Sequence, residues 1–181
     1  MAANPCEEFF EKHADCDEKV KELQKLPEAL AWEKISASPH SPGIVNPGEV
    51  LGRQVTHPTF YDENKQKIKP SWFDDATSRG MSTDRLAYTT TRDIADRAIA
   101  RAAKWNTDNP TKPPRTFHSI GKLAVDDVRS LTFESTQAFA IYDTALKTNV
   151  AHADICLVAA SKEARSLRVS LYEMAETIFV D

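Results

Sequence analysis

The sequence feature that most constrains the fold is a run near the C-terminus that is apolar except for Asp154, residues 153–160 with the sequence ADICLVAA. A short continuous run of this kind is typical of a strand that is buried on both faces of its sheet. Other strand-like and helical segments alternate along residues 50–181. Strands interspersed with helices in a region of this size predict an α+β domain with a small mixed sheet flanked by helices.

Local patterns predict the elements of this domain. Strands are expected at residues 50–57, 86–88, 116–123, 138–142 and 153–160, and helices at residues 94–105, 125–131 and from Ser161 to Ile178. Residues 58–80 contain prolines and turn-forming residues and are expected to be mostly loop. Thr90 and Asp93 have the spacing of a capping box, so a helix is expected to begin there.

The N-terminal region differs from the rest in charge and in period. Residues 1–35 hold five Lys/Arg and nine Asp/Glu, which accounts for the whole net charge of −4. Apolar residues recur there at three- and four-residue steps, which predicts a helical arm that bends at Pro27. Residues 36–49 are rich in Pro, Ser and Gly, so we expect an acidic helical arm (1–35), a linker (36–49) and an α+β body (50–181).

Composition excludes several broad classes. The chain has 181 residues, of which 41% are hydrophobic and 28% charged, as expected for a globular protein. The negative net charge argues against a protein that coats nucleic acid over its whole surface. No apolar run approaches the roughly 20 residues of a membrane-spanning helix, so no membrane partner is expected. The first residues lack a signal-peptide pattern and the three cysteines form no disulfide framework, so we expect a cytoplasmic protein.

The familiar catalytic and metal-binding motifs are missing from the sequence. It contains no G-x-G-x-x-G, no Walker loop, no H-E-x-x-H, no C-x-x-C and no G-x-S-x-G pattern. His13 and Cys16 have a possible ligand spacing, but His13 lies on the apolar stripe of the arm and no second pair supports them. We therefore expect no metal site, and we expect Cys156, which lies within the apolar run, to be a packing residue.

Polar residues in, at the ends of or between the expected strands are the better candidates for a functional site. They are Arg53, His57, Ser82, Thr83, Arg85, His152 and Asp154. A charged residue in an otherwise apolar strand needs a partner, so Arg53 is expected to bind an anion. The alternative is a structural one, in which Arg53 pairs with a carboxylate, His57 caps a turn, and Ser82 and Thr83 cap a helix.

In the functional interpretation these residues converge on one ligand. His57 and His152 would flank the anion as hydrogen-bond donors or as general acid and base groups. Ser82 and Thr83 would supply hydroxyl groups, and Arg85 would be a second cationic clamp. Asp154 lies on the same strand face as His152, so it would orient a histidine or contact the ligand itself.

Part of this set resembles a known pattern. The segments Leu51-Gly52-Arg53-Gln54-Val55-Thr56-His57-Pro58, Pro70-Ser71-Trp72-Phe73, Met81-Ser82 and Asn149-x-x-His152-Ala153 resemble a family of short bacterial proteins that has no established activity. The resemblance covers roughly residues 50–160, and Trp72 and Met81 depart slightly from the pattern. It implies a compact bacterial domain and names no reaction.

The order of Arg53, Ser82-Thr83 and Glu134 is also similar to the ADP-ribosyltransferase pattern. This resemblance implies NAD as a possible cofactor, with Arg53 on the phosphates and Glu134 as a catalytic carboxylate. The chemistry is reasonable, because a guanidinium binds a pyrophosphate bidentately and a carboxylate stabilises a developing oxocarbenium charge. We therefore expect a pocket for a nucleotide or phosphorylated small molecule, and the resemblance implies an ADP-ribosyltransferase-like enzyme.

Two other classes of partner have some support. Residues 97–122 carry six basic residues against one acidic residue, with Trp105, Phe117 and His118 among them. Cations beside aromatic rings suit single-stranded nucleic acid, although a solvated helix face explains the same pattern. The apolar stripe of the arm, which includes Phe9, Phe10, Val20 and Leu23, could instead bind a protein partner, as in a regulatory or immunity-type protein.

Overall fold

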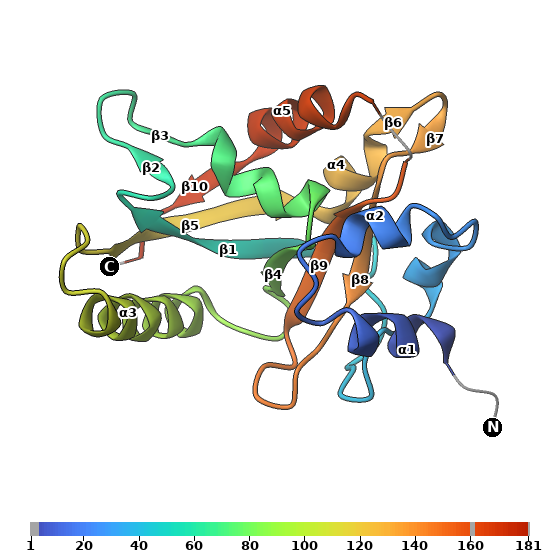
Figure 1. Cartoon of the computed structure of the whole chain (residues 1–181), viewed down its shortest axis with the longest axis horizontal. Coiled ribbons are helices and arrows are strands. Elements are labelled where there is room, and N and C mark those ends of the chain that lie inside the picture. Colours follow the sequence, from blue (N-terminus) through green and yellow to red (C-terminus); the bar gives the residue numbers. More distant parts are fainter. Residues whose placement is uncertain (1–3, 160–161, 181) are drawn as a thin grey trace.

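The computed structural model describes residues 4–159 and 162–180 and is built around a six-stranded antiparallel sheet (Figure 1). The strand order is β10-β5-β1-β4-β9-β8. These strands are β1 (Val50–His57), β4 (Met81–Arg85), β5 (Thr116–Ala124), β8 (Phe139–Asp143), β9 (His152–Leu157) and β10 (Glu176–Ile178). Helices lie on both faces of the sheet, so the α+β class is confirmed.

The sheet forks between its two central strands. β1 pairs with β5 along its whole length, from Val50 opposite Ala124 to His57 opposite Thr116. The pairing of β1 with β4, in contrast, consists of Leu51 with Arg85 and Gly52 with Asp84. The rest of β4 pairs with β9. The half-sheet β10-β5-β1 therefore separates from the half-sheet β4-β9-β8, and Figure 1 shows the strands of the two halves running in clearly different directions.

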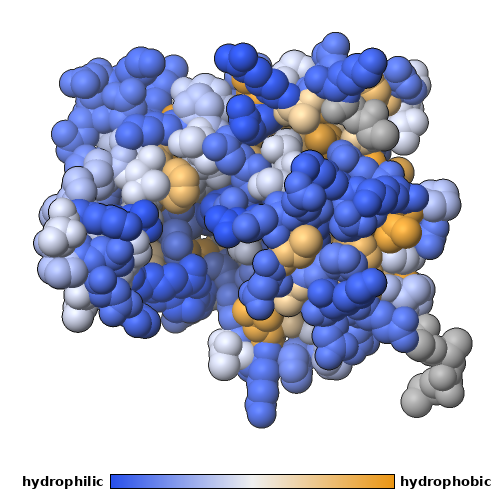
Figure 2. Space-filling view, viewed as in Figure 1, coloured by the Kyte–Doolittle hydropathy of each residue, from blue (hydrophilic) through white to orange (hydrophobic). Residues whose placement is uncertain are grey.

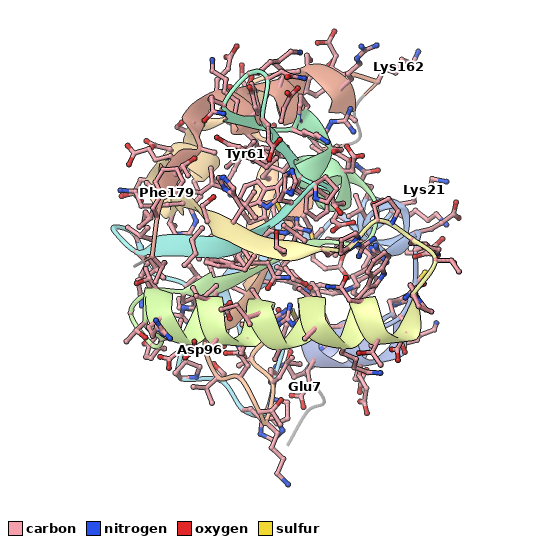
Figure 3. All side chains as sticks on the ribbon, turned by 90° about the vertical axis from the view of Figure 1, so that its left-hand side faces the viewer. Glu7, Lys21, Tyr61, Asp96, Lys162 and Phe179 are labelled. Carbon is pink, nitrogen blue, oxygen red and sulfur yellow. The ribbon has the colours of Figure 1, made fainter. Side chains whose placement is uncertain are left out.

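Helix α3 (Thr91–Asp108) covers one face of β1 and β5, while the 3₁₀ helix η2 (Pro70–Thr77) and helix α5 (Ala164–Met174) cover the other (Figures 1 and 3). In Figure 3, Asp96 on α3 and Tyr61 lie on opposite sides of the sheet. The η2 layer approaches β5 very closely, because a Cβ atom at Gly121 would lie 2.4 Å from Cη2 of Trp72. The fully buried Trp72 ring thus uses the space that glycine leaves open.

The N-terminal segment packs against the β8 side of the sheet. It forms two short helices, α1 (Pro5–Lys12) and α2 (Lys19–Leu23), and the 3₁₀ helix η1 (Leu30–Lys34). The Phe10 ring lies 4.9 Å from the Tyr142 ring, and the Tyr142 hydroxyl donates to the Ala29 carbonyl. Glu33 accepts a hydrogen bond from the backbone N–H of Ile141 at the free edge of β8, which blocks that edge against further pairing.

The apolar stripe of residues 1–35 therefore packs on the body of the protein and is not available to a protein partner. Phe10, Val20 and Leu23 are buried, and they belong to the same core as the strands β8 and β9. Residues 36–49 contain neither helix nor strand, in line with the expected coil. They are tied to the sheet, since the N–H of Ala37 donates to the Asp143 carbonyl.

The local predictions succeed at most of the long elements. The expected strands at 50–57, 116–123 and 138–142 are present, and so are helix α4 (Val125–Ser130) and the capping box of Thr90 and Asp93 at α3. The strand of the apolar run begins at His152 and ends at Leu157, before Ala160. The predicted start of the last helix, Ser161, lies outside the described residues.

Three predictions of secondary structure are wrong. The strand expected at 86–88 lies at Met81–Arg85 instead. The expected loop 58–80 contains η2 and a small hairpin of β2 (Tyr61–Asp62) and β3 (Lys67–Ile68). The last helix ends at Met174, and Ile178 lies in β10. A second small hairpin is formed by β6 (Thr132–Phe133) and β7 (Thr136–Gln137). Among the described helices, none is both long and apolar enough to span a membrane.

Candidate functional site in the fork of the sheet

A hollow of about 530 Å³ lies in the fork between β1 and β4. It is also lined by α3, by the segment after η2 and by the loop between β8 and β9. Figure 2 shows the surface hollowed between the part that contains α3 and the part that contains α1, with hydrophilic residues around the opening. Its basic lining residues are Lys19, Arg53, Arg79, Arg97 and Arg101, and its acidic ones are Asp75 and Asp84. We call this hollow the cationic cleft.

Arg53 reaches the cleft from β1, but its charge already has a partner in the chain. Its Nη2 lies 2.7 Å from Oδ2 of Asp75, and its Nη1 donates to the Trp72 carbonyl at 2.8 Å. Burial lowers the pKa of Arg53, and Asp75 partly offsets this effect. Burial alone would raise the pKa of Asp75, but Arg53 and Arg79 together hold it below its usual value. The structural alternative for Arg53, a pair with a carboxylate, is therefore the observed one.

Two arginines of α3 have donors in the cleft that the described residues do not fully use. Arg97 and Arg101 are four residues apart, so they lie on one side of the helix. Arg97 Nη2 lies 3.0 Å from Asp84 Oδ2, while Asp84 Oδ1 accepts from the side chain of Asn149 at 2.6 Å. The buried Nε and Nη2 atoms of Arg97 make no hydrogen bond within the described part of the chain. Within the same part of the chain, the only polar contact of Arg101 is with a neutral group, the side-chain oxygen of Gln54.

A second hollow, of about 520 Å³, opens beside the cationic cleft. It lies between α1, residues 37–40 and the loop that joins β8 to β9. The two hollows share the lining residues Ala14, Lys19, Ser82, Leu146 and His152. They are therefore two parts of one depression, and its shared wall carries a cation, a hydroxyl group and an imidazole.

Asp154 organises the side chains at this boundary. The Ser82 hydroxyl donates to Asp154 Oδ1 at 3.1 Å, and Lys19 Nζ donates to Asp154 Oδ2 at 3.4 Å. Both Lys19 and Asp154 are buried, so this ion pair closes the arm onto β9. The structure thus brings Ser82, His152 and Asp154 together as predicted. Thr83 lies beside them, and its hydroxyl is bonded to the Ala153 carbonyl.

His152 is positioned by Thr144 and not by Asp154. Its Nδ1 lies 3.0 Å from the Thr144 carbonyl and 2.9 Å from the Thr144 hydroxyl. Because a carbonyl only accepts, this contact favours a proton on Nδ1. The neutral ring then presents Nε2 as an acceptor, 3.9 Å from Asp154 Oδ1. In this tautomer, Nε2 can accept a hydrogen bond from a bound molecule.

Arg85, predicted as a second clamp, is not part of the site. It is fully buried on β4, where its Nε and Nη2 donate to the two Glu49 carboxylate oxygens at 2.8 and 2.6 Å. Two more donors reach the carbonyls of Gly43 and Ile44. Burial would lower the pKa of Arg85, but Glu49 raises it above its ordinary value. Arg85 therefore connects the coil 36–49 to the sheet.

His57 and Glu134 also lie away from the fork. His57 is at the opposite end of β1, with Nε2 3.1 Å from Glu63. Glu134 is in the turn between β6 and β7, at a φ of 49°, and lines a different hollow beside Gln24 and Leu30. Neither residue lines the cationic cleft or the second hollow. The prediction that they share a site with Arg53 is corrected, because His57 turns to Glu63 at the end of β1 and Glu134 lies in a separate hairpin.

The basic segment 97–122 does not form one surface. Arg97 and Arg101 face the cleft, whereas Lys122 forms an ion pair with a glutamate of β10 at 2.6 Å. Arg115 stacks over Trp105 at 3.9 Å. His118 stacks on a tyrosine ring at 3.6 Å, and burial followed by the nearby His57 lowers its pKa. The residues that would have to act together on nucleic acid are thus divided among several contacts.

Sequence reasoning missed Asp75, Arg79 and Asn149 as site residues. Asp75 and Arg79 lie in a segment read as loop, and their positions follow from η2. The described residues contain no group of three or more His, Cys, Asp or Glu side chains that could hold a metal ion. No protein-family model, curated protein or solved structure matches the chain.

Proposed function

We propose that the protein binds a nucleotide or another phosphorylated small molecule in the cationic cleft. The main support for this proposal is the charge of the residues that line the cleft. They include five basic side chains and two carboxylates, an excess of three positive charges in the lining. A hollow lined by one sign of charge concentrates ligands of the opposite sign. Its volume of about 530 Å³ lies within the range of roughly 300–1,000 Å³ found for small-molecule sites.

Arg97 and Arg101 are the residues that we assign to the phosphate. Arg53 is bound to Asp75, and Arg79 is shared between Asp75 and Asp17. Arg97, in contrast, lies beside Asp84 but keeps two buried nitrogens without a hydrogen bond among the described residues, and Arg101 contacts only the neutral Gln54 side chain there. Guanidinium groups bind phosphate oxygens through charge-assisted, often bidentate hydrogen bonds. Ser82 and His152 lie where the cleft borders the second hollow, and there they would contact the remainder of the ligand.

The competing functions have less support in the arrangement of the residues. A partner that binds through the stripe of residues 1–35 would have to displace Phe10, Val20 and Leu23 from the core. An ADP-ribosyltransferase-like reaction through Glu134 would need that carboxylate in the cleft, and it lines a different hollow. NAD remains one of the nucleotides to be tested as a ligand.

The test is a thermal-shift and calorimetric screen with phosphate, pyrophosphate, AMP, ADP, ATP and NAD at low salt. A ligand at 100 times its Kd stabilises the folded state by about 2.7 kcal/mol. For a chain of this size, that corresponds to a rise in Tm of roughly 5–11 °C. Arg97→Gln should weaken binding at least tenfold. Lys104→Gln is the matched control, because Lys104 lies on the same helix and outside the cleft.

The proposal is overturned if none of these anions shifts the Tm of the wild-type protein. It is also overturned if Arg97→Gln and Lys104→Gln bind the same anion equally well, because binding would then occur elsewhere.

A further inference from the structure

We infer that the second hollow is the subsite for the heterocyclic ring of a nucleoside phosphate whose phosphate lies in the cationic cleft. The inference rests on the proposed function and adds the class of ligand and its direction in the site. It depends on the connection between the two hollows, on their opposite charge and on the side chains at their boundary.

The connection is shown by the lining. Ser82 and His152 belong to both hollows, and so does Leu146 at the tip of the β8–β9 loop. A molecule that fills one hollow therefore borders the other. Each hollow, at about 520 and 530 Å³, has a volume within the roughly 300–1,000 Å³ of small-molecule sites. An inorganic phosphate alone would leave most of this space unused.

The charges of the two hollows differ in sign. The second hollow is lined by three acidic side chains and two basic ones, an excess of one negative charge, where the cationic cleft has an excess of three positive charges. The residues concerned are Glu7, Glu11, Asp154, Lys19 and Lys147. A phosphate is repelled by this lining, whereas an uncharged ring with hydrogen-bond donors is not. The charge difference thus fixes which end of the ligand enters which hollow.

The second hollow also offers apolar contact. Phe10, Ala37, Ala145 and Leu146 line it together with the polar groups. Ligand sites typically combine apolar walls with a few polar groups that set the orientation. Leu146 is 48% exposed at this point, which leaves an aliphatic side chain available to cover one face of a ring.

The boundary between the hollows suits a sugar. Ser82 contributes a hydroxyl and His152 contributes Nε2, and both lie between the cationic and the apolar parts. Hydroxyl groups of a ribose can donate to Nε2 of a neutral imidazole and exchange hydrogen bonds with a serine. The order phosphate, sugar and ring in a nucleoside phosphate therefore matches the order Arg97, His152 and Leu146 in the site.

The experiment compares matched ligands by titration calorimetry with the full chain. We expect AMP to bind at least tenfold more tightly than ribose 5-phosphate, and ADP at least tenfold more tightly than pyrophosphate. Leu146→Ala should reduce the advantage of ADP over pyrophosphate, taken as the ratio of their two Kd values for the same variant, by at least threefold. Val150→Ala is the control, since Val150 is 45% exposed in the same connection and lines neither hollow.

A second measurement locates the ring directly. Photolabelling with 8-azido-ADP, followed by peptide mapping, should place the label in residues 7–14, 36–40 or 144–147. If pyrophosphate binds and the ring adds nothing, or if the label falls on α3 or on the β2–β3 hairpin, this inference is overturned while the proposed function stands. If no phosphate compound binds at all, both are overturned.

Discussion

The replacement of Arg85 by Met tests whether this buried arginine is structural. Arg85 donates four hydrogen bonds, to both carboxylate oxygens of Glu49 and to the carbonyls of Gly43 and Ile44. Its Nη1 also lies 3.6 Å from Oδ1 of Asp143, an atom that is buried and has no hydrogen bond within the described residues. Methionine would fill much of the space but would remove all four of these donors, and it would leave the carboxylates of Glu49 and Asp143 without their cationic partner.

The removal of one partner from a buried ion pair costs about 3–5 kcal/mol, because the other charge is left unpaired. For a chain of this size, such a loss lowers Tm by roughly 6–20 °C. Urea unfolding followed by circular dichroism measures it as a lower midpoint with an unchanged slope. Lys104→Met on the exposed side of α3 is the control and should change stability by no more than about 0.5 kcal/mol.

The reasoning is refuted if Arg85→Met is as stable as Lys104→Met. If the variant also loses phosphate binding at unchanged stability, Arg85 is a ligand clamp and the structural role described above is wrong.

Three further predictions follow from single contacts. Gly121→Ala should lower stability by about 1–3 kcal/mol in urea unfolding, because its Cβ would lie 2.4 Å from the immobile ring of Trp72. Thr90→Ala should lower stability by about 1 kcal/mol through loss of the N-cap of α3, and Thr107→Ala, near the other end of the helix, should not. Asp75→Asn should make the stability of the protein depend less on pH in the acid range. The lowered pKa of Asp75 contributes stability above the ordinary Asp value of 3.8, and this stability is lost as the pH falls through the lower pKa of the folded state. Parallel profiles of unfolding free energy for the wild type and the variant between pH 2 and 6 would contradict the pairing.

The elements that the sequence predicted correctly are those set by local interactions. The helix after Thr90 has an apolar period and a capping box, and both depend on residues within a few positions of each other. The strand 50–57 has β-branched and apolar residues between turn signals. The last helix shows the limit of this reasoning, since the apolar period continues to Ile178 while the pairing of that residue with Ile120 places it in a strand.

The site depends on long-range register, and this is why the sequence predicted only part of it. Ser82, His152 and Asp154 were grouped correctly, because β4 and β9 are neighbours with Ser82 opposite Asp154. Arg97 was assigned to a basic surface because its distance from Asp84 is invisible in the sequence. Likewise, Asp75 became the partner of Arg53 through the path of η2 across the sheet.

The polar composition of β4 explains why the cationic cleft lies in the fork of the sheet. β4 lies near the centre of the sheet, yet four of its five residues are polar, in the sequence MSTDR. Buried ion pairs are often no more stabilising than apolar residues at the same positions. A polar central strand therefore needs a hydrogen-bond or ionic partner for each of its buried polar side chains. Its side chains do so through Asp154, the Ala153 carbonyl, Asn149 and Glu49. After this pairing, Arg97 of α3 keeps two buried nitrogens without a hydrogen bond among the described residues, and Arg101 contacts only a neutral side chain there. These are the groups of the fork with which an anion would interact.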